Sequence, residues 1–145
     1  MTTNGLLSKR RENDLGGHPK FCENPGMRVL IADDQKSVGT SLADLVQLCH
    51  HEVVEVVASG LEAIQAYGRH HPDVVLMDYH MPKLNGATAC RNIMAKYPNA
   101  RVILVSGLPK EVADSGALAV LLKPVSLDQL YAALHAAARP PASNP

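Results

Sequence analysis

The chain shows two alternating hydrophobic patterns between residues 27 and 138. Five short apolar runs, mostly of β-branched residues, occur at Val29–Ala32, Val53–Val57, Val74–Met77, Val102–Val105 and Val120–Leu122. Runs of this length predict buried β-strands, and the stretches between them place apolar residues at helical spacing. Strands that alternate with helices predict an α/β fold, in which a parallel sheet is covered by helices on both faces.

The helical stretches carry start signals and apolar faces of their own. Ser59–Glu62 and Ser126–Gln129 have the spacing of capping boxes, in which two side chains bond backbone N–H groups at a helix start. The residues expected to face inward are Val38, Leu42, Leu45, Val46 and Cys49, then Ile64 and Tyr67, then Cys90, Ile93, Met94 and Tyr97, and finally Leu127, Leu130, Tyr131 and Leu134. Before the fifth strand there is room for only about two helical turns, around Glu111–Ser115.

Both ends of the chain lack these patterns. Residues 1–26 are rich in Gly, Asn, Pro and charge, and we expect a flexible tail there. Its basic triplet, Lys9–Arg11, is either a contact for an acidic partner or simply solvated charge. Residues 139–145 predict a short C-terminal tail, so residues 27–138 are expected to form one domain.

Composition narrows the classes of function. Lys and Arg together number 14, as do Asp and Glu, so no net charge favours nucleic acid or a membrane surface. The longest apolar run, Ala117–Leu122, is far shorter than the ~20 residues that a membrane span needs. Three widely spaced cysteines without a CxxC pair indicate reduced thiols. We therefore expect a soluble, cytoplasmic protein with no nucleic-acid or membrane partner.

Polar side chains follow four of the five predicted strands. Asp33 and Asp34 come after the first strand, Asp78 after the third, Ser106 after the fourth and Lys123 after the fifth. Because parallel strands end at the same edge of a sheet, we expect these side chains to lie close together. Three converging carboxylates repel one another, and a bound divalent cation relieves that repulsion. An all-oxygen set of ligands suits Mg²⁺ better than Zn²⁺.

This set of groups is the one that phosphoryl transfer to a carboxylate requires. Asp78 would be the nucleophile, while the metal ion and Lys123 would neutralise charge on the equatorial oxygens. The hydroxyl of Ser106 adds a hydrogen-bond donor. The sequence therefore predicts a phosphoacceptor site, centred on Asp78.

Four segments of the chain resemble a known family: RVLIADDQ, VVLMDYHMPKLNG, VILVSG and LLKP. In this order they are similar to the receiver domain of bacterial two-component response regulators, over residues 27 to about 138. The resemblance implies a three-layer, flavodoxin-like fold with five parallel strands in the order 2-1-3-4-5. The fourth helix would be shorter than is usual in the family.

By the same resemblance, Asp78 accepts a phosphoryl group from a sensor histidine kinase or a histidine phosphotransfer protein. The implied Mg²⁺ ligands are Asp33, Asp34, Asp78 and the backbone carbonyl of His80. Ser106 stands where the family has a hydroxyl that bonds a phosphoryl oxygen, and Lys123 stands at the position of its characteristic lysine. The Lys–Pro bond after that position is often cis in the family.

Two positions depart from the family pattern. Val120 stands where an aromatic residue usually relays the state of the site, and the short fourth helix alters the usual dimerisation face. We therefore expect a monomer or a weak, non-standard dimer. His80 has two interpretations: its imidazole either tunes the lifetime of the phosphoryl group or is a loop side chain with no role.

The favoured hypothesis is a stand-alone response regulator receiver, which signals by protein contact or phosphorelay and catalyses only its own phosphorylation and dephosphorylation. An alternative is a receiver-like binding module that works without phosphorylation. A third hypothesis, an aspartyl-phosphate phosphatase of the haloacid-dehalogenase type, requires a second Asp two residues after the nucleophile. His80 occupies that place.

Overall fold

The computed structural model describes residues 26–108 and 116–138 of the chain. In chain order, the elements are β1 (Arg28–Ala32), α2 (Lys36–Leu48), β2 (Glu52–Val57), α3 (Gly60–His70), β3 (Val74–Asp78), α4 (Gly86–Lys96), β4 (Val102–Ser106), β5 (Ala119–Leu122) and α5 (Leu127–Ala138). Each strand contains one of the five predicted apolar runs, so the prediction of the strands is confirmed. The short helix predicted around Glu111–Ser115 lies outside the described residues.

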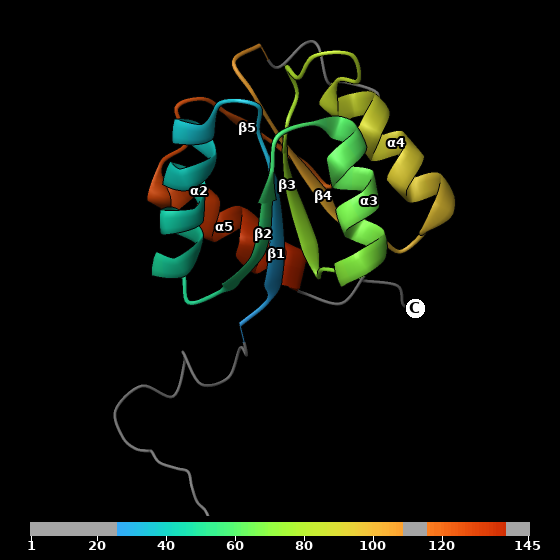
Figure 1. The fold of residues 1–145 in the computed structure, drawn as a ribbon. Helices are drawn as coiled ribbons and strands as arrows, with labels where there is room; N and C mark the ends of the chain where they lie inside the picture. Colours follow the sequence, from blue (N-terminus) through green and yellow to red (C-terminus); the bar gives the residue numbers. More distant parts are fainter. Residues whose placement is uncertain (1–25, 109–115, 139–145) are drawn as a thin grey trace, which may run out of the picture.

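The strands form one parallel sheet in the order β2-β1-β3-β4-β5, as the sequence predicts. Figure 1 shows this sheet between two pairs of helices, with α2 and α5 on one side and α3 and α4 on the other. The order reverses between β1 and β3, and in such sheets ligands bind at the carboxyl ends of the strands beside this switch point.

Alternate residues of the central strands belong to two separate hydrophobic cores, one on each face of the sheet. Leu30 and Val75 point toward α3 and α4, whereas Ile31 and Leu76 point toward α2 and α5. Because successive side chains of a strand leave the sheet on opposite faces, a strand that is covered twice must be apolar throughout. The continuous apolar runs of β1, β3 and β4 have this origin, and every residue of these three strands except Arg28 is buried.

The expected apolar face of α5 is wrong in part. Leu130 and Leu134 are buried, but the side chains of Leu127 and Tyr131 are 41% and 49% exposed. Ala137 completes the buried stripe, and Tyr131 stacks on the ring of His135 at 5.9 Å. The stripe is narrow because α5 packs near β5, an edge strand whose own side chains alternate between half-buried and exposed.

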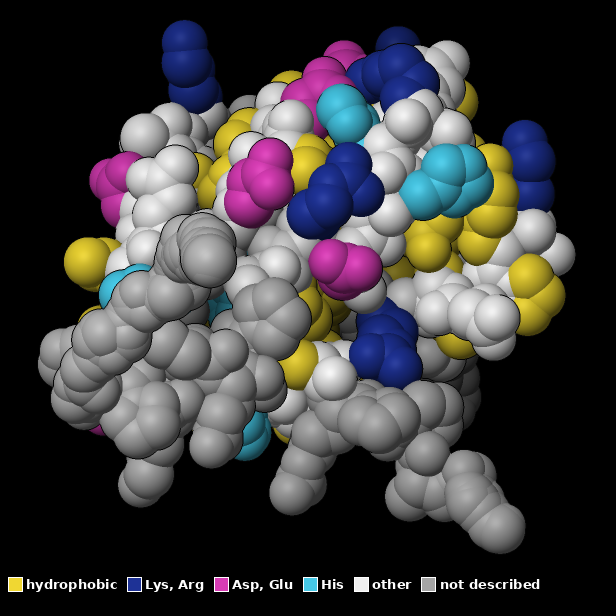
Figure 2. All heavy atoms as spheres, turned by 90° about the horizontal axis from the view of Figure 1, so that it is seen from below, with side chains coloured by type: hydrophobic (Ala, Val, Ile, Leu, Met, Phe, Trp, Pro, Cys, Tyr) yellow, Lys and Arg dark blue, Asp and Glu magenta, His cyan; other side chains and the backbone are white. Residues whose placement is uncertain are grey.

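At the edge of the sheet where the strands begin, two arginine side chains donate hydrogen bonds to backbone carbonyls of helices. Arg28 donates from Nη1 to the carbonyl of His70 at 2.7 Å, and Arg101 donates to the carbonyl of Ala137. Each arginine thus bonds a carbonyl at the C-terminal end of a helix, where carbonyls lack intrahelical partners. Figure 2, which looks onto this edge, shows acidic and basic side chains interspersed across it.

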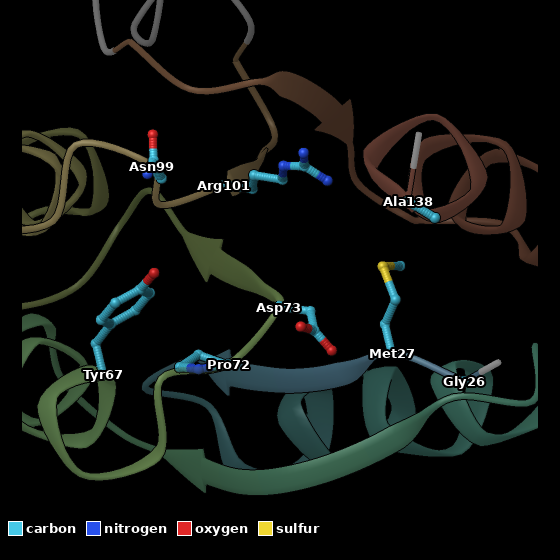
Figure 3. Close-up of a pocket in the computed structure, with 8 residues that line it drawn as sticks. All are labelled: Gly26, Met27, Tyr67, Pro72, Asp73, Asn99, Arg101 and Ala138. Atoms are coloured by element: carbon cyan, nitrogen blue, oxygen red, sulfur yellow. The ribbon is translucent and has the colours of Figure 1, made fainter. Parts of the chain in front are cut away.

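A cavity of about 500 Å³ opens at the same edge. Its buried lining includes Met27, Tyr67 and Pro72, and Asp73 and Arg101 lie at its sides (Figure 3). Asp73 accepts a hydrogen bond from the N–H of Arg28 at 2.8 Å. Arg28 and Asp73 therefore hold the start of β1 to the end of α3, and Arg101 holds the start of β4 to the end of α5.

Candidate functional site

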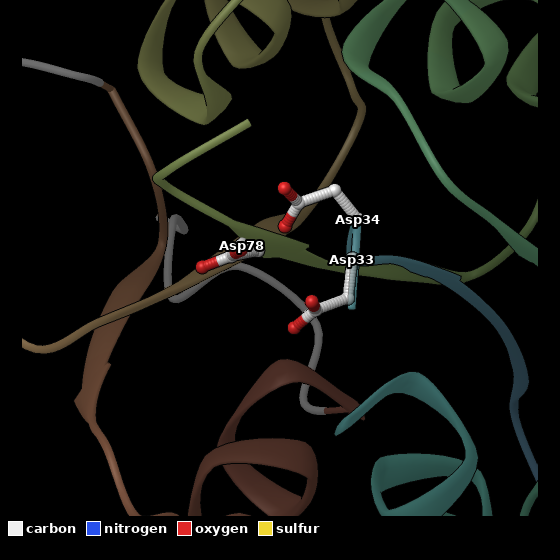
Figure 4. Close-up of side chains that lie close together, drawn as sticks. All are labelled: Asp33, Asp34 and Asp78. Carbon is white, nitrogen blue, oxygen red and sulfur yellow. The ribbon is translucent and has the colours of Figure 1, made fainter. Parts of the chain in front are cut away.

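The carboxyl ends of the strands bring the predicted side chains together. Asp33 and Asp34 directly follow β1, Asp78 is the last residue of β3, and β1 pairs with β3. Each of the three residues offers a carboxylate oxygen, and these oxygens all lie within 4.8 Å of one another. Figure 4 shows Asp33 and Asp34 reaching from β1 toward Asp78 on the neighbouring strand. The predicted convergence of the acidic residues is therefore present.

Two of these carboxylates are buried without adequate partners. Asp33 and Asp78 are each only 2% exposed, whereas Asp34 is exposed. Asp33 Oδ1 accepts a hydrogen bond from the N–H of Gln35 at 2.9 Å. Asp33 Oδ2 and Asp78 Oδ1 are buried and accept no hydrogen bond. Leaving such charged oxygens unpaired is costly, so the site calls for a cation.

Lys123 supplies one positive charge to this site. Its Nζ lies 2.9 Å from Asp78 Oδ1 and 3.7 Å from Asp33 Oδ2, so it forms ion pairs although no aligned hydrogen bond reaches those oxygens. The Lys123–Pro124 peptide bond is cis, and the N–H of Lys123 bonds the carbonyl of Ser106 at 3.0 Å. One ammonium group against three carboxylates leaves the site negative.

The pKa values follow from this imbalance. Burial raises the pKa of Asp33, and the charges of Asp78 and Asp34 raise it further against the Gln35 hydrogen bond and Lys123. Burial lowers the pKa of Lys123, but its contact with Asp78 and the charges of Asp33 and Asp34 outweigh that effect and raise it overall. Lys123 is therefore charged at neutral pH, and the acidic residues together suit a divalent cation.

The hydroxyl of Ser106 lies at the end of β4 and is completely buried. It donates to the carbonyl of Leu108 at 3.1 Å and accepts from the N–H of Leu108 at 3.0 Å. Ser106 is thus held by the backbone two residues further along.

The backbone at the two ends of the loop after Asp78 lies close together, at Gly86 and at Asp78–Tyr79. The N–H of Gly86 donates to the carbonyl of Tyr79 at 2.8 Å. A Cβ atom on Gly86 would lie 2.3 Å from the carbonyl oxygen of Asp78, so only glycine fits without a shift. The side chain of His80 is exposed, and its ring meets that of Tyr79 edge to face at 4.9 Å.

An apolar groove opens beside Lys123. Its volume is about 460 Å³, and it lies between α2 and the residues that follow β5. Its apolar lining consists of Val38, Leu42, Leu45, Val105, Pro124 and Val125. The groove adjoins the acidic site, because Lys123 belongs to both.

The family model of the response regulator receiver domain matches residues 29–135 of this chain. The chain belongs to this family. Chemotaxis protein CheY of Listeria monocytogenes is 35% identical over 118 residues, which are 78% of this chain and 99% of that protein. CheY of Thermotoga maritima is 34% identical over 115 residues, or 76% and 96% of the two chains.

Solved structures agree with the receiver assignment. The CheX–CheY complex with BeF₃ and Mg²⁺ from Borrelia burgdorferi matches with a TM-score of 0.71 and 30% identity, over 75% of this chain and 87% of the other. The receiver is not a conventional enzyme, so the haloacid-dehalogenase hypothesis is set aside. Among residues 26–108 and 116–138, the receiver has no helix that is both long and apolar enough to cross a membrane.

Sequence reasoning missed one feature of the receiver site. Leu108 holds Ser106 through its backbone N–H and carbonyl, and backbone groups give no signal in a pattern of side chains. Gly86, in contrast, is part of the matched segment VVLMDYHMPKLNG, where a glycine after a loop indicates a close backbone approach.

Proposed function

We propose that this receiver accepts a phosphoryl group on Asp78 from the phosphohistidine of a sensor histidine kinase or a histidine phosphotransfer protein. One observation carries the proposal: Asp78 Oδ1 is buried, accepts no hydrogen bond and lies 2.9 Å from the ammonium of Lys123. A buried carboxylate in an apolar strand has no structural benefit that would offset its desolvation. It has a clear use as a nucleophile beside a cation.

The proposed reaction is a single displacement at phosphorus. A carboxylate oxygen of Asp78 forms the new O–P bond, the N–P bond of the donor breaks, and the donor imidazole leaves with the bonding electrons. Lys123 neutralises charge on the transferred group, and the hydroxyl of Ser106 donates a hydrogen bond to one of its oxygens.

The proposed cofactor is Mg²⁺. The residues that would hold it are Asp33, Asp34 and Asp78, with the backbone carbonyl of His80. When bound, Mg²⁺ supplies the positive charge that lets a phosphoryl group approach three carboxylates. The buried oxygens of Asp33 and Asp78 support this assignment, because they accept no hydrogen bond and the single ammonium of Lys123 does not balance three carboxylates.

We also propose that the phosphodonor docks on the groove beside Lys123. An apolar surface next to an acidic site lets a helix of the donor bury side chains while its phosphohistidine reaches Asp78. The Borrelia CheY is seen bound to CheX, so a similar receiver has a protein partner. For this chain, residues 27–138 would act as a stand-alone cytoplasmic domain, as a monomer or weak dimer, signalling by contact or phosphorelay.

A second candidate function is binding without phosphorylation. It is favoured by β5, where Val120 is exposed and aliphatic at the position at which the family usually has an aromatic relay. In that case the acidic site would remain, but its state would not reach a partner.

Intact mass spectrometry tests the proposed function. The protein is incubated with acetyl phosphate and Mg²⁺, and the expected product carries one phosphoryl group. The adduct should be absent from Asp78→Asn and present in Asp44→Asn, which removes an exposed carboxylate on α2. If the wild-type protein forms no adduct and also fails to bind beryllofluoride, the result would favour binding without phosphorylation over the proposed function.

A further inference from the structure

The hydroxyl of Ser106 is occupied before any phosphoryl group arrives. It makes two hydrogen bonds with the same residue, donating to the Leu108 carbonyl at 3.1 Å and accepting from the Leu108 N–H at 3.0 Å. Ser106 is completely buried, whereas Leu108 is 56% exposed. The role proposed for Ser106 at the phosphoryl group therefore has to be compatible with these two bonds.

A hydroxyl group has a single proton to donate but two lone pairs that accept. If Ser106 donates to a phosphoryl oxygen, it can no longer donate to the carbonyl of Leu108. It can still accept from the N–H of Leu108, because that bond uses a lone pair. Phosphorylation and the Ser106–Leu108 carbonyl bond are therefore mutually exclusive, whereas phosphorylation and the N–H bond are not.

We propose that Leu108 is a positioning residue for phosphoryl recognition and the first reporter of the phosphorylated state. Its N–H keeps Ser106 Oγ in place in both states, and its carbonyl holds the hydroxyl proton until a phosphoryl oxygen takes it. This inference rests on the proposed function of Asp78. In this inference the backbone carbonyl of Leu108 responds to phosphorylation, a role that an aromatic side chain usually has in the family.

The surroundings of Leu108 fit a role in reporting. Its side chain is 56% exposed, so a change in its backbone reaches the surface directly. The neighbouring strand β5 presents only aliphatic side chains and pairs with β4 up to Ser106 and Leu122. Donation by the Leu108 N–H also polarises the Ser106 hydroxyl, which makes it a stronger donor to a phosphoryl oxygen.

NMR spectroscopy of the full-length, ¹³C,¹⁵N-labelled protein with beryllofluoride and Mg²⁺ tests the inference. The carbonyl carbon of Leu108 is read through its own amide, because Pro109 follows it in the sequence and has no N–H. In Ser106→Ala the carbonyl of Leu108 has lost the hydroxyl that donates to it. Its ¹³C chemical shift in this variant is therefore the reference for a carbonyl without that hydrogen bond. On adding beryllofluoride, the wild-type carbonyl should move toward the Ser106→Ala value, while the Leu108 amide stays protected from hydrogen exchange.

Two results would overturn the inference. One is a Leu108 carbonyl that does not move although beryllofluoride binds; the other is loss of amide protection together with the carbonyl shift, since the N–H bond should persist. A ¹⁹F spectrum shows whether beryllofluoride is bound. If it does not bind, the proposed function of Asp78 fails, and this inference fails with it for a distinguishable reason.

Proline substitution gives a second, independent measurement. Leu108→Pro removes the N–H donor and keeps a carbonyl, so beryllofluoride affinity should fall about fivefold, as expected for one lost hydrogen bond. Gly107→Ala is the control in the same loop, because a Cβ there meets nothing within 4 Å, and its affinity should be unchanged. Equal affinity of folded Leu108→Pro and wild type would contradict the positioning role.

Discussion

The two edges of the sheet use charged residues in opposite ways. At the edge where the strands begin, Arg28 and Arg101 bond helix carbonyls, and Asp73 bonds a backbone N–H. At the edge where the strands end, Asp33 and Asp78 keep buried oxygens that accept no hydrogen bond. Among the described residues, the three charged groups at the first edge are satisfied, whereas at the second edge one ammonium, that of Lys123, faces three carboxylates, and in this sense that edge is unsatisfied.

This difference distinguishes charged groups that stabilise the fold from charged groups that remain available to a ligand. A polar group that is hydrogen-bonded within the chain stabilises the fold, because that hydrogen bond offsets the free energy of removing the group from water. Buried carboxylates that outnumber their one cationic partner, Lys123, lower stability until a bound cation balances their charge, and natural proteins keep such groups where function requires them. The unsatisfied edge also lies beside the topological switch point of the sheet.

The largest contrast is expected between Asp78→Asn and Asp73→Ala. Asp78→Asn should abolish the acetyl phosphate adduct, because it removes the carboxylate that we propose as the nucleophile. Asp73→Ala should keep the adduct and lower the free energy of unfolding by at most about 1 kcal/mol, the worth of one exposed hydrogen bond. Intact mass and urea unfolding measure the two effects. An adduct on Asp78→Asn would show that phosphorylation occurs elsewhere.

The edge that carries the acidic site was more predictable from the sequence than the edge where the strands begin. Asp33 and Lys123 each follow a strand and Asp78 ends one, and parallel strands must end at one edge, so the topology alone brings them together. The bonds of Arg28 and Arg101 to helix carbonyls depend on where helices end in space. No periodicity encodes that position.

Two further features lay beyond a sequence pattern. The exposure of Leu127 was not foreseen, because helical spacing defines an apolar stripe but not how far the packed sheet extends beneath it. The bonds between Ser106 and Leu108 use backbone groups, which every residue carries. Sequence reasoning thus predicted that the acidic side chains converge at this edge, but not the backbone contacts beside them.

Magnesium should stabilise the protein through the unsatisfied edge alone. At a hundredfold excess over its Kd, Mg²⁺ is expected to raise the free energy of unfolding by about 2.7 kcal/mol relative to EDTA. Asp33→Asn should lose most of this increment, whereas Asp73→Ala should keep all of it. Urea unfolding with and without Mg²⁺ measures the increment in each variant. An equal increment in Asp33→Asn would remove Asp33 from the metal site.

Gly86 offers a test of the backbone beneath the site. Gly86→Ala places a Cβ 2.3 Å from the carbonyl oxygen of Asp78, so the loop must shift. We expect a loss of roughly 1–3 kcal/mol in the free energy of unfolding, typical of overpacking, and slower phosphorylation of Asp78. Gly107→Ala, which has open space, should change neither quantity. If Gly86→Ala folds and phosphorylates normally, the close approach is not needed to place Asp78.

The smallest effect is a difference in how the two edges respond to acid. The folded-state pKa of Asp33 is raised above its ordinary 3.8, chiefly by burial, so the folded protein binds this proton before the unfolded chain does. Asp33 therefore adds stability as pH falls from its raised pKa toward 3.8. At the other edge, His51 Nδ1 accepts the N–H of Met27 at 2.9 Å, and burial lowers the pKa of His51 below 6.5.

His51 has the opposite sign, because the unfolded chain binds its proton first. Its contribution is full above pH 6.5 and is lost as pH falls toward its lowered pKa. In EDTA, the difference in unfolding free energy between wild type and Asp33→Asn should favour the wild type increasingly as the solution becomes acidic. The corresponding difference for His51→Asn, which keeps an acceptor for Met27 but does not titrate, should move the other way. Parallel pH profiles for the two variants would mean that the two edges do not differ in the way their hydrogen bonds indicate.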